Sequence, residues 1–212
     1  MKKNYLSILA CFVLAVSNAQ LKENGVVEIT PKIGYSSFAE ITNNTGNNGF
    51  QNTTGTTGSI TGLSTGATID YYFNNRWSLR SGLLFEKMGA TSVIFNSTYQ
   101  DKLNYISIPI NANWHFGSTR KWNLNFGLSP SFLTSSEFTK NNIIDKNVPN
   151  NVVNSFQIGL SFGIGYKIEI NKKFGIIIEN QGFSGFTNIF NYNNLNAKNS
   201  GSSLNIGAVI QL

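Results

Sequence analysis

In the segment Phe156-Gln-Ile-Gly-Leu-Ser-Phe-Gly-Ile-Gly-Tyr-Lys-Ile-Glu-Ile170, every second residue is large and apolar. The residues between them are small, polar or charged, and this period of two is the pattern of a β-strand with two unlike faces. The alternation continues for 15 residues, whereas strands of soluble proteins usually have about 5–6 residues. A tilted strand that crosses a membrane needs about 9–11 residues. We therefore interpret this stretch as a wall strand of a transmembrane β-barrel.

The start of the chain has the pattern of a secretory signal peptide. Two lysines follow Met1, an apolar run covers residues 5–16, and small residues surround Ala19, after which we expect cleavage. The run is shorter than the roughly 20 apolar residues that a transmembrane helix needs. The predicted organisation is therefore a signal peptide at residues 1–19 and one outer-membrane β-barrel domain at residues 20–212.

The composition excludes several classes of protein. Only 12% of the residues are charged, and Asn, Gly, Ser, Thr and aromatic residues are abundant, as expected when lipid-facing apolar residues alternate with polar lumen residues. The net charge of +6, which becomes +4 without Lys2 and Lys3, is not gathered into a basic stripe, so no nucleic-acid partner is predicted. Cys11, the only cysteine, lies in the predicted signal peptide, so no disulfide or thiolate metal site is expected.

The same alternation recurs along the chain and predicts an all-β fold, an eight-stranded antiparallel up-and-down barrel. The expected strands cover residues 27–38, a segment ending at 73, a segment starting at 77, and residues 103–116, 122–132, 156–170, 174–179 and 204–212. Three short turns, at residues 74–76, 117–121 and 171–173, alternate with four longer segments, at residues 39–59, 89–102, 134–153 and 184–202. This asymmetry is typical of outer-membrane barrels with short periplasmic turns and long extracellular loops. Pro31 predicts a local irregularity, because proline removes a ladder donor.

Charged residues on the inner faces of these strands are expected to form a polar network in the lumen. Pairing Phe73 with Trp77 across their turn places Asp70 opposite Arg80, which predicts an ion pair. The interior of an eight-stranded barrel is just wide enough for side chains, so a filled lumen is favoured over an ion path. Glycines on the central strand are expected to make space for long side chains such as Arg80. The predicted network comprises Lys32, Asp70, Arg80, Glu86, Lys167, Glu169 and Glu179.

Aromatic residues flank the short turns, where they are expected to form a girdle at the membrane–water interface. The predicted girdle comprises Phe73, Trp77, Phe116, Trp122 and Phe174.

No catalytic motif is evident. His115 is the only histidine, and a Ser-His-acid hydrolase would have to use it. A lumen or interface residue is the simpler interpretation of its place near a short turn, and a lone histidine is a poor basis for a metal site. We predict no enzyme activity, no cofactor and no metal.

Three features resemble the PorT-type (porin-like) outer-membrane β-barrel family. Leu103-Asn-Tyr-Ile-Ser-Ile-Pro-Ile110 is similar to the Tyr-x-x-Ile-Pro strand of that family, the Gly-rich strand at residues 158–170 is similar to a family strand, and the signal peptide and terminal strand occupy the expected places. The chain ends in Leu212, whereas many outer-membrane proteins end in Phe. The resemblance implies a location in the cell outer membrane but no agreed activity.

The sequence therefore predicts a non-enzymatic outer-membrane barrel with a narrow or closed lumen and a structural or surface-interaction role. Three alternatives stay open: a component of an envelope export or assembly system, a soluble periplasmic ligand-binding barrel with its apolar face inward, and a small lipid enzyme that uses His115. The expected partners are outer-membrane lipid and envelope or extracellular proteins that contact the loops at residues 39–59, 134–153 and 184–202.

Overall fold

A computed structural model of the chain describes residues 22–44, 53–94, 96–145, 152–191 and 195–212. The signal peptide predicted at residues 1–19 lies outside the described residues. Within the described residues, no helix is long and apolar enough to cross a membrane.

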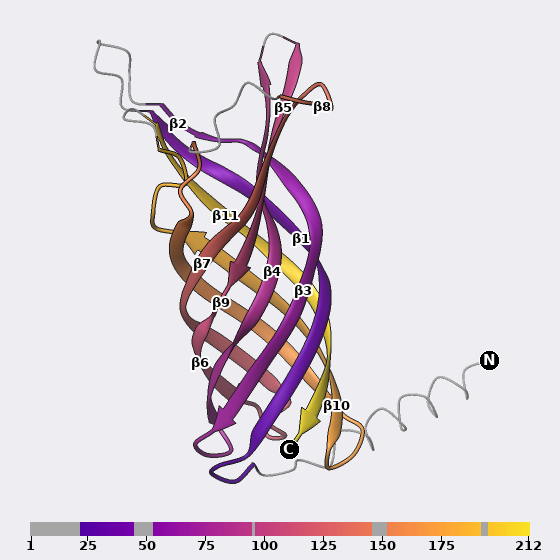
Figure 1. Cartoon of the computed structure of the whole chain (residues 1–212). Coiled ribbons are helices and arrows are strands. Elements are labelled where there is room, and N and C mark those ends of the chain that lie inside the picture. Colours follow the sequence, from indigo (N-terminus) through magenta and orange to yellow (C-terminus); the bar gives the residue numbers. More distant parts are fainter. Residues whose placement is uncertain (1–21, 45–52, 95, 146–151, 192–194) are drawn as a thin grey trace, which may run out of the picture.

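These residues form one antiparallel β-sheet that closes into a barrel (Figure 1). In chain order, the strands are β1 (Val27–Asn44), β2 (Thr53–Thr56), β3 (Gly58–Tyr72), β4 (Trp77–Ile94), β5 (Ser97–Ser107), β6 (Ile110–Phe116), β7 (Trp122–Lys140), β8 (Ile143–Ile144), β9 (Phe156–Glu169), β10 (Phe174–Gly185) and β11 (Leu195–Gln211). The wall follows the order β1, β3, β4, β5, β7, β9, β10 and β11, and β11 pairs with β1. β5 and β6 both pair with β4 on one side and β7 on the other, so together they count as one strand of the wall. The described part of the sheet therefore closes as an eight-stranded barrel, which confirms the predicted fold class.

The two ends of the barrel differ. We call the end that holds the three short turns the turn end, and the opposite end the loop end; β1 starts and β11 finishes at the turn end (Figure 1). Two of the turns use the same asparagine geometry. Asn74 Oδ1 accepts hydrogen bonds from the backbone nitrogens of Arg76 and Trp77 at 2.8 and 3.0 Å, and Asn171 Oδ1 accepts equivalent bonds at 2.8 and 2.9 Å. Such turns reverse the chain within a few residues.

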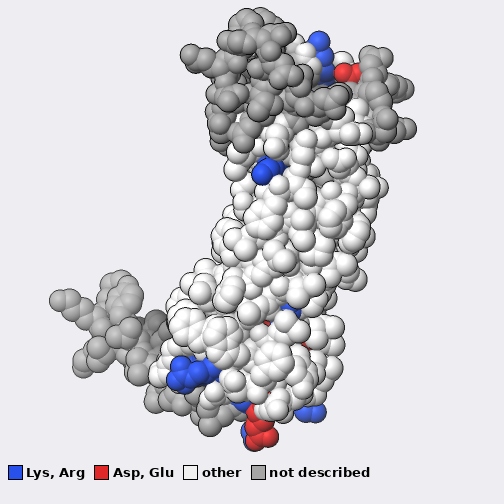
Figure 2. Space-filling model, turned by 90° about the vertical axis from the view of Figure 1, so that its left-hand side faces the viewer, with Lys and Arg blue, Asp and Glu red and all other residues white. Residues whose placement is uncertain are grey.

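The two faces of the wall follow the alternation. On β9, odd-numbered residues from Gln157 to Lys167 are buried, while even-numbered residues from Phe156 to Ile168 face outward. Over the middle of the barrel, outward positions carry large exposed apolar side chains, and the face in Figure 2 shows charged side chains gathered towards the two ends. We call this surface the apolar belt; it includes Ile33, Tyr35, Leu63, Ile69, Leu79, Leu83, Phe85, Ile110, Leu124, Phe126, Leu128, Phe162, Ile164, Ile178, Leu204 and Ile206. The apolar face points outward, opposite to what a soluble ligand-binding barrel requires.

The strands extend further towards the loop end than predicted. β1 continues to Asn44, β4 to Ile94 and β7 to Lys140. On the other strands, β5 already begins at Ser97 and β11 at Leu195. Strands extend into residues 89–102, which was an open alternative for that segment. The segments predicted as loops at residues 39–59, 134–153 and 184–202 also contain strand residues. These three predictions were wrong because they required alternating apolar residues in every strand, and the strands continue through polar residues beyond the apolar belt.

Proline interrupts the ladder at two places. The β1–β11 ladder omits Thr30 and Pro31 without a change of register, whereas Pro31 still lies opposite Ala67 of β3, so the predicted irregularity is a gap on one side of the strand. The strand predicted at residues 103–116 is divided, because β5 ends at Ser107 and β6 begins after Pro109. Proline has no backbone N–H to donate to a neighbouring strand.

Barrel closure predicts a specific cross-link between β1 and β11. Ser37 lies opposite Ser202, and opposite residues of antiparallel strands have Cα atoms about 4.5–5.5 Å apart, within the roughly 4.4–6.8 Å of disulfides. In a Cys11→Ser background, we expect Ser37→Cys with Ser202→Cys to form a disulfide on oxidation, measured by non-reducing gel mobility. The control pairs Ser37→Cys with Ser200→Cys, two residues along the same face. Equal cross-linking in both pairs, or none in either, would contradict the closure.

Candidate functional site in the barrel interior

A buried ion cluster crosses the lumen in the half nearer the turn end. Arg80 contacts Asp70 at 3.0 Å, as the β3–β4 hairpin register predicts, and contacts Glu179 on β10 at 2.8 Å. Lys32 on β1 makes an ion pair with the other oxygen of Glu179. We call these four residues the Glu179 cluster. Because its members come from β1, β3, β4 and β10, the cluster ties separate parts of the wall together.

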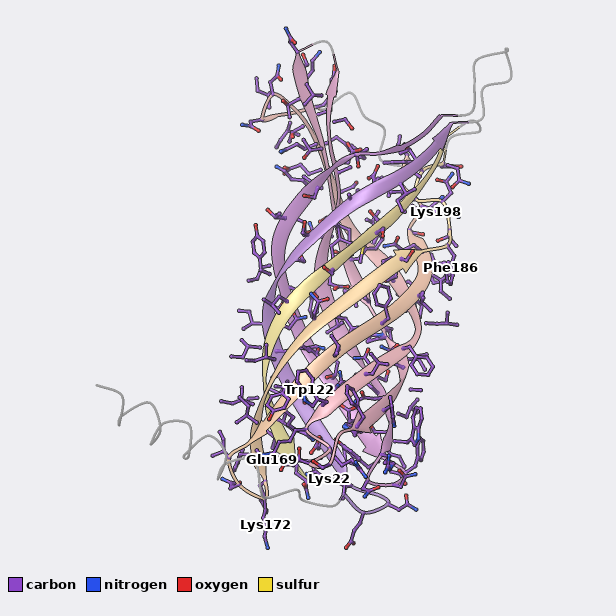
Figure 3. All side chains as sticks on the ribbon, turned by 180° about the vertical axis from the view of Figure 1, so that it is seen from behind. Lys22, Trp122, Glu169, Lys172, Phe186 and Lys198 are labelled. Atoms are coloured by element: carbon purple, nitrogen blue, oxygen red, sulfur yellow. The ribbon has the colours of Figure 1, made fainter. Side chains whose placement is uncertain are left out.

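A second cluster lies closer to the turn end and centres on Glu28. The Glu28 carboxylate contacts Lys167 at 2.8 Å and Lys22 at 2.9 Å, and it accepts a hydrogen bond of 2.8 Å from the Tyr72 hydroxyl. Figure 3 labels Lys22 at this end of the barrel. We call this set the Glu28 cluster. The polar network predicted from the sequence omitted Glu28 and Tyr72, although the alternation places both side chains inward. It also omitted Lys22, which precedes the first strand and therefore has no periodic pattern.

The other two predicted network residues lie beside these clusters without forming a salt bridge to another described residue. Glu86 on β4 is buried within electrostatic reach of Lys32. Glu169, half-buried at the end of β9 near the turn-end rim (Figure 3), lines a small cavity together with Lys22, Glu28 and Lys167. The structure therefore brings five of the seven predicted residues into the two clusters, namely Lys32, Asp70, Arg80, Lys167 and Glu179.

A layer of uncharged amides lies next to the Glu179 cluster. Asn113 donates a hydrogen bond of 2.8 Å to Asp70, and Asn123 donates one of 3.1 Å to Asn113. Asn111 donates to Asn125 at 2.8 Å and to Ser161 at 3.1 Å. Short amide side chains on β6 and β7 thus link the ion cluster to the middle of the lumen.

Glycines on β9 create the space for this layer. A Cβ atom on Gly165 would lie 2.4 Å from Asn123 Oδ1, and one on Gly163 would lie 2.6 Å from Gln181 Oε1. Real Cβ contacts do not come so close. The sequence expected these glycines to accommodate long side chains such as Arg80; the neighbours they accommodate are instead the amides of adjacent strands.

An apolar plug fills the lumen towards the loop end. Val153 forms a bridge with Phe190, and Asn154 donates a backbone hydrogen bond of 2.9 Å to Ile189. The plug comprises Phe38, Met88, Leu103, Tyr105, Val152, Val153, Phe183, Ile189, Phe190 and Ala197. Some residues of the plug lie in the segments 134–153 and 184–202, which were predicted to be polar loops. That prediction was wrong for these residues, because short apolar pairs among polar residues show no periodicity from which a buried position could be predicted.

The clusters leave little free space in the turn-end half of the lumen. The cavity among Glu28, Tyr72, Arg80 and Lys167 has a volume of about 10 Å³, which is about the space of one water molecule. A second cavity, beside Lys22, is equally small at about 10 Å³. Side chains therefore fill most of the space around the two clusters.

Aromatic rings form a continuous row around part of the turn-end rim. Ring centroids of Trp77 and Trp114 lie 6.3 Å apart, Trp114 and Phe116 5.1 Å, Phe116 and Trp122 6.3 Å, and Trp122 and Tyr166 4.9 Å. Trp114 and Tyr166 complete the row but were absent from the predicted girdle, although their outward positions could have revealed them. Of the other predicted members, Phe73 packs on Tyr71 at 5.5 Å and Phe174 is exposed at the same rim.

The family follows from a match over most of the chain. Residues 18–191 match the family model described as "Outer membrane protein beta-barrel domain". The chain belongs to this family. The protein is accordingly an outer-membrane β-barrel, located in the cell outer membrane.

Solved structures of outer-membrane barrels are similar to this barrel at low sequence identity. The N-terminal β-barrel domain of OprF from Pseudomonas aeruginosa has 14% identity and a TM-score of 0.47, covering 90% of this chain and 100% of that chain. OprG from Pseudomonas aeruginosa has 12% identity and a TM-score of 0.48, and the match covers 91% of this chain and 99% of that chain. Ail of Yersinia pestis has 14% identity and a TM-score of 0.41, and the match covers 88% of this chain and 99% of that chain. No curated protein sequence matches the chain.

The surroundings of His115 in this outer-membrane barrel do not form a hydrolase triad. Ser78 Oγ lies 3.0 Å from His115 Nε2 and donates a hydrogen bond of 3.0 Å to Asp70. A triad needs the acid to hold the other ring nitrogen of the histidine. Here the carboxylate of Asp70 contacts the serine hydroxyl instead. His115 also stacks on Tyr72 with centroids 4.8 Å apart, as expected of a packing residue.

The Glu179 cluster predicts a large loss of stability in the Glu179→Gln variant. Removing this charge leaves Lys32 without its anion and Arg80 with only Asp70, and breaking a buried pair costs about 3–5 kcal/mol. The free energy of unfolding would be measured by urea titration in lipid vesicles.

The matched control is Glu137→Gln at the loop end. Glu137 pairs with Lys102 at 2.9 Å, but their side chains are 43% and 31% exposed, and such pairs contribute at most about 1 kcal/mol. Equal losses in the two variants would show that the buried cluster does not hold the barrel together.

Proposed function

We propose that this outer-membrane barrel acts through its surface, and neither as a pore nor as an enzyme. The observation that carries the proposal is the occupied lumen. Two ion clusters, the amide layer and the apolar plug follow one another along the barrel axis, and the turn-end cavities have room for about one water each. A solute path or a substrate pocket would need space that these side chains fill.

The loop end supports a role in interaction with other molecules. There β4, β5 and β7 pair beyond the apolar belt, and β8 adds to β7 (Figure 1). Val93 and Ile143 are 71% and 74% exposed in this extension, and Ile144 is exposed beside them. Loops on a rigid scaffold often carry function, and exposed apolar groups mark contact sites. We propose that envelope or extracellular proteins contact this end, through residues of the segments 39–59, 134–153 and 184–202.

The more specific resemblance supports one alternative. The Tyr105-Ile-Ser-Ile-Pro109 motif spans the end of β5 and the proline break before β6, and β9 is the Gly-rich strand. PorT-type membership would make the protein a component of an envelope export or assembly system. The surface role and the export role both require that the protein is exported from the cytoplasm. We propose that residues 1–19 are the signal peptide and that residues 20–212 are the mature barrel.

A pair of experiments in cells separates the two roles. A photo-reactive residue at Ile143 is expected to cross-link to a protein partner outside the membrane, whereas the same residue at Ile164 in the apolar belt should give no protein adduct. Deleting the protein is expected to leave exported proteins in the medium unchanged. Retention of exported proteins inside the deletion strain, with no adduct at position 143, would overturn the surface role in favour of export.

A further inference from the structure

A group of oxygen-bearing side chains lies in the barrel mouth, beside the plug and beyond the apolar belt. Glu40 on β1 lies opposite Asn199 on β11, and Asp101 and Tyr105 project from β5. Asp101 and Tyr105 are both within electrostatic reach of the Glu40 carboxylate, and Tyr105 lies beside Asn199. Lys198, the neighbour of Asn199, marks this level in Figure 3. We call these four residues the mouth site.

Two oxygens of the mouth site are buried and unsatisfied. Glu40 Oε1 and Asn199 Oδ1 have no hydrogen-bond partner among the described residues, and the two residues are 2% and 0% exposed. One N–H of the Asn199 amide donates to Gln157 Oε1 at 3.1 Å, and the Asn199 side chain also lies against the Tyr105 hydroxyl. Leaving a buried polar group unpaired costs about 1–3 kcal/mol, so the site lacks a group that these oxygens could bind.

No basic side chain of the described residues neutralises the carboxylates of the mouth site. At the turn end, the buried carboxylates of Glu28 and Glu179 each contact two basic side chains. In the part of the chain that the structure describes, no lysine or arginine pairs with Glu40 or Asp101; Lys102, next to Asp101, pairs with Glu137. Lys198 alternates with Asn199 along β11 and so points to the opposite face of the wall.

We propose that the mouth site binds one hard divalent cation, with the carboxylates of Glu40 and Asp101 and the amide oxygen of Asn199 as ligands. Carboxylate and amide oxygens are the donors that calcium and magnesium prefer, and calcium accepts irregular sets of 6–8 oxygens that include water. Tyr105 would donate its hydroxyl proton to a bound carboxylate. The cation would join β1, β5 and β11 across the mouth, as the Glu179 cluster joins strands nearer the turn end.

A proton competes with the cation for these carboxylates. Burial, with a smaller contribution from Asp101, raises the pKa of Glu40 to about 8, and burial raises the pKa of Asp101 to about 6. Cation binding requires deprotonated ligands and therefore releases protons. The binding experiment is accordingly done at pH 9, where both carboxyl groups are ionised.

The test is a calcium titration of the full chain, folded in detergent micelles and first stripped with EDTA. We expect one calcium per chain by calorimetry and a rise of the unfolding temperature with calcium concentration, because a ligand that binds only the folded state stabilises it. Glu40→Gln and Asp101→Asn should each weaken binding at least tenfold. Glu137→Gln, which removes a carboxylate at the same end of the barrel, should leave the affinity unchanged.

Two results would overturn the proposal. If the wild-type chain binds no calcium, the mouth site holds a proton only. If Glu40→Gln and Asp101→Asn bind calcium as the wild type does, the bound calcium lies elsewhere on the surface. Glu40→Gln keeps the shape of the side chain and removes a buried charge, so it should fold, and heat-dependent gel mobility checks that each variant is a closed barrel.

Discussion

A wall that crosses lipid must satisfy all of its backbone N–H and C=O groups within itself, and the rest of this structure depends on that constraint. The sheet meets it by pairing β11 with β1, so the spanning wall has no free edge. Once the ring is closed, the period of two assigns each side chain to lipid or to the lumen. The apolar belt and the polar interior are therefore two consequences of one alternation, seen most clearly on β9.

The narrow interior is filled in a different way at each level. Near the turn end, carboxylates of Glu28 and Glu179 are each held by two basic side chains, which offsets the cost of removing charge from water. In the middle, short amides hydrogen-bond to one another in the space left by Gly163 and Gly165. Towards the loop end, Ile189 and its neighbours close the lumen with apolar packing. This filling of the interior is the basis for the proposed role at the surface of the protein.

The sequence predicted those parts of the structure that the membrane imposes. The alternation at residues 156–170 indicated which face meets lipid, and the turn between Phe73 and Trp77 was enough to pair Asp70 with Arg80. These inferences succeeded because a strand in lipid has only two environments for its side chains, and because a short turn fixes the register of a hairpin.

The parts that the sequence did not predict lie where the membrane no longer constrains the chain. Beyond the apolar belt, β1 and β11 continue pairing through polar residues, for example Glu40 opposite Asn199, and no hydrophobic period marks them. The plug depends on Val153 meeting Phe190, a contact between segments distant in sequence. Lys22 reaches Glu28 from outside any strand. Each of these features is set by tertiary contact, which a local pattern does not encode.

Side chains that close the lumen should block ions, and the electrical conductance of the purified barrel in a planar lipid bilayer measures this directly. We expect no steady single-channel current for the folded protein, identified by its heat-dependent gel mobility. Stable, ohmic channels that persist at low voltage would contradict this expectation, because they require a continuous water path past the Glu179 cluster and the apolar plug.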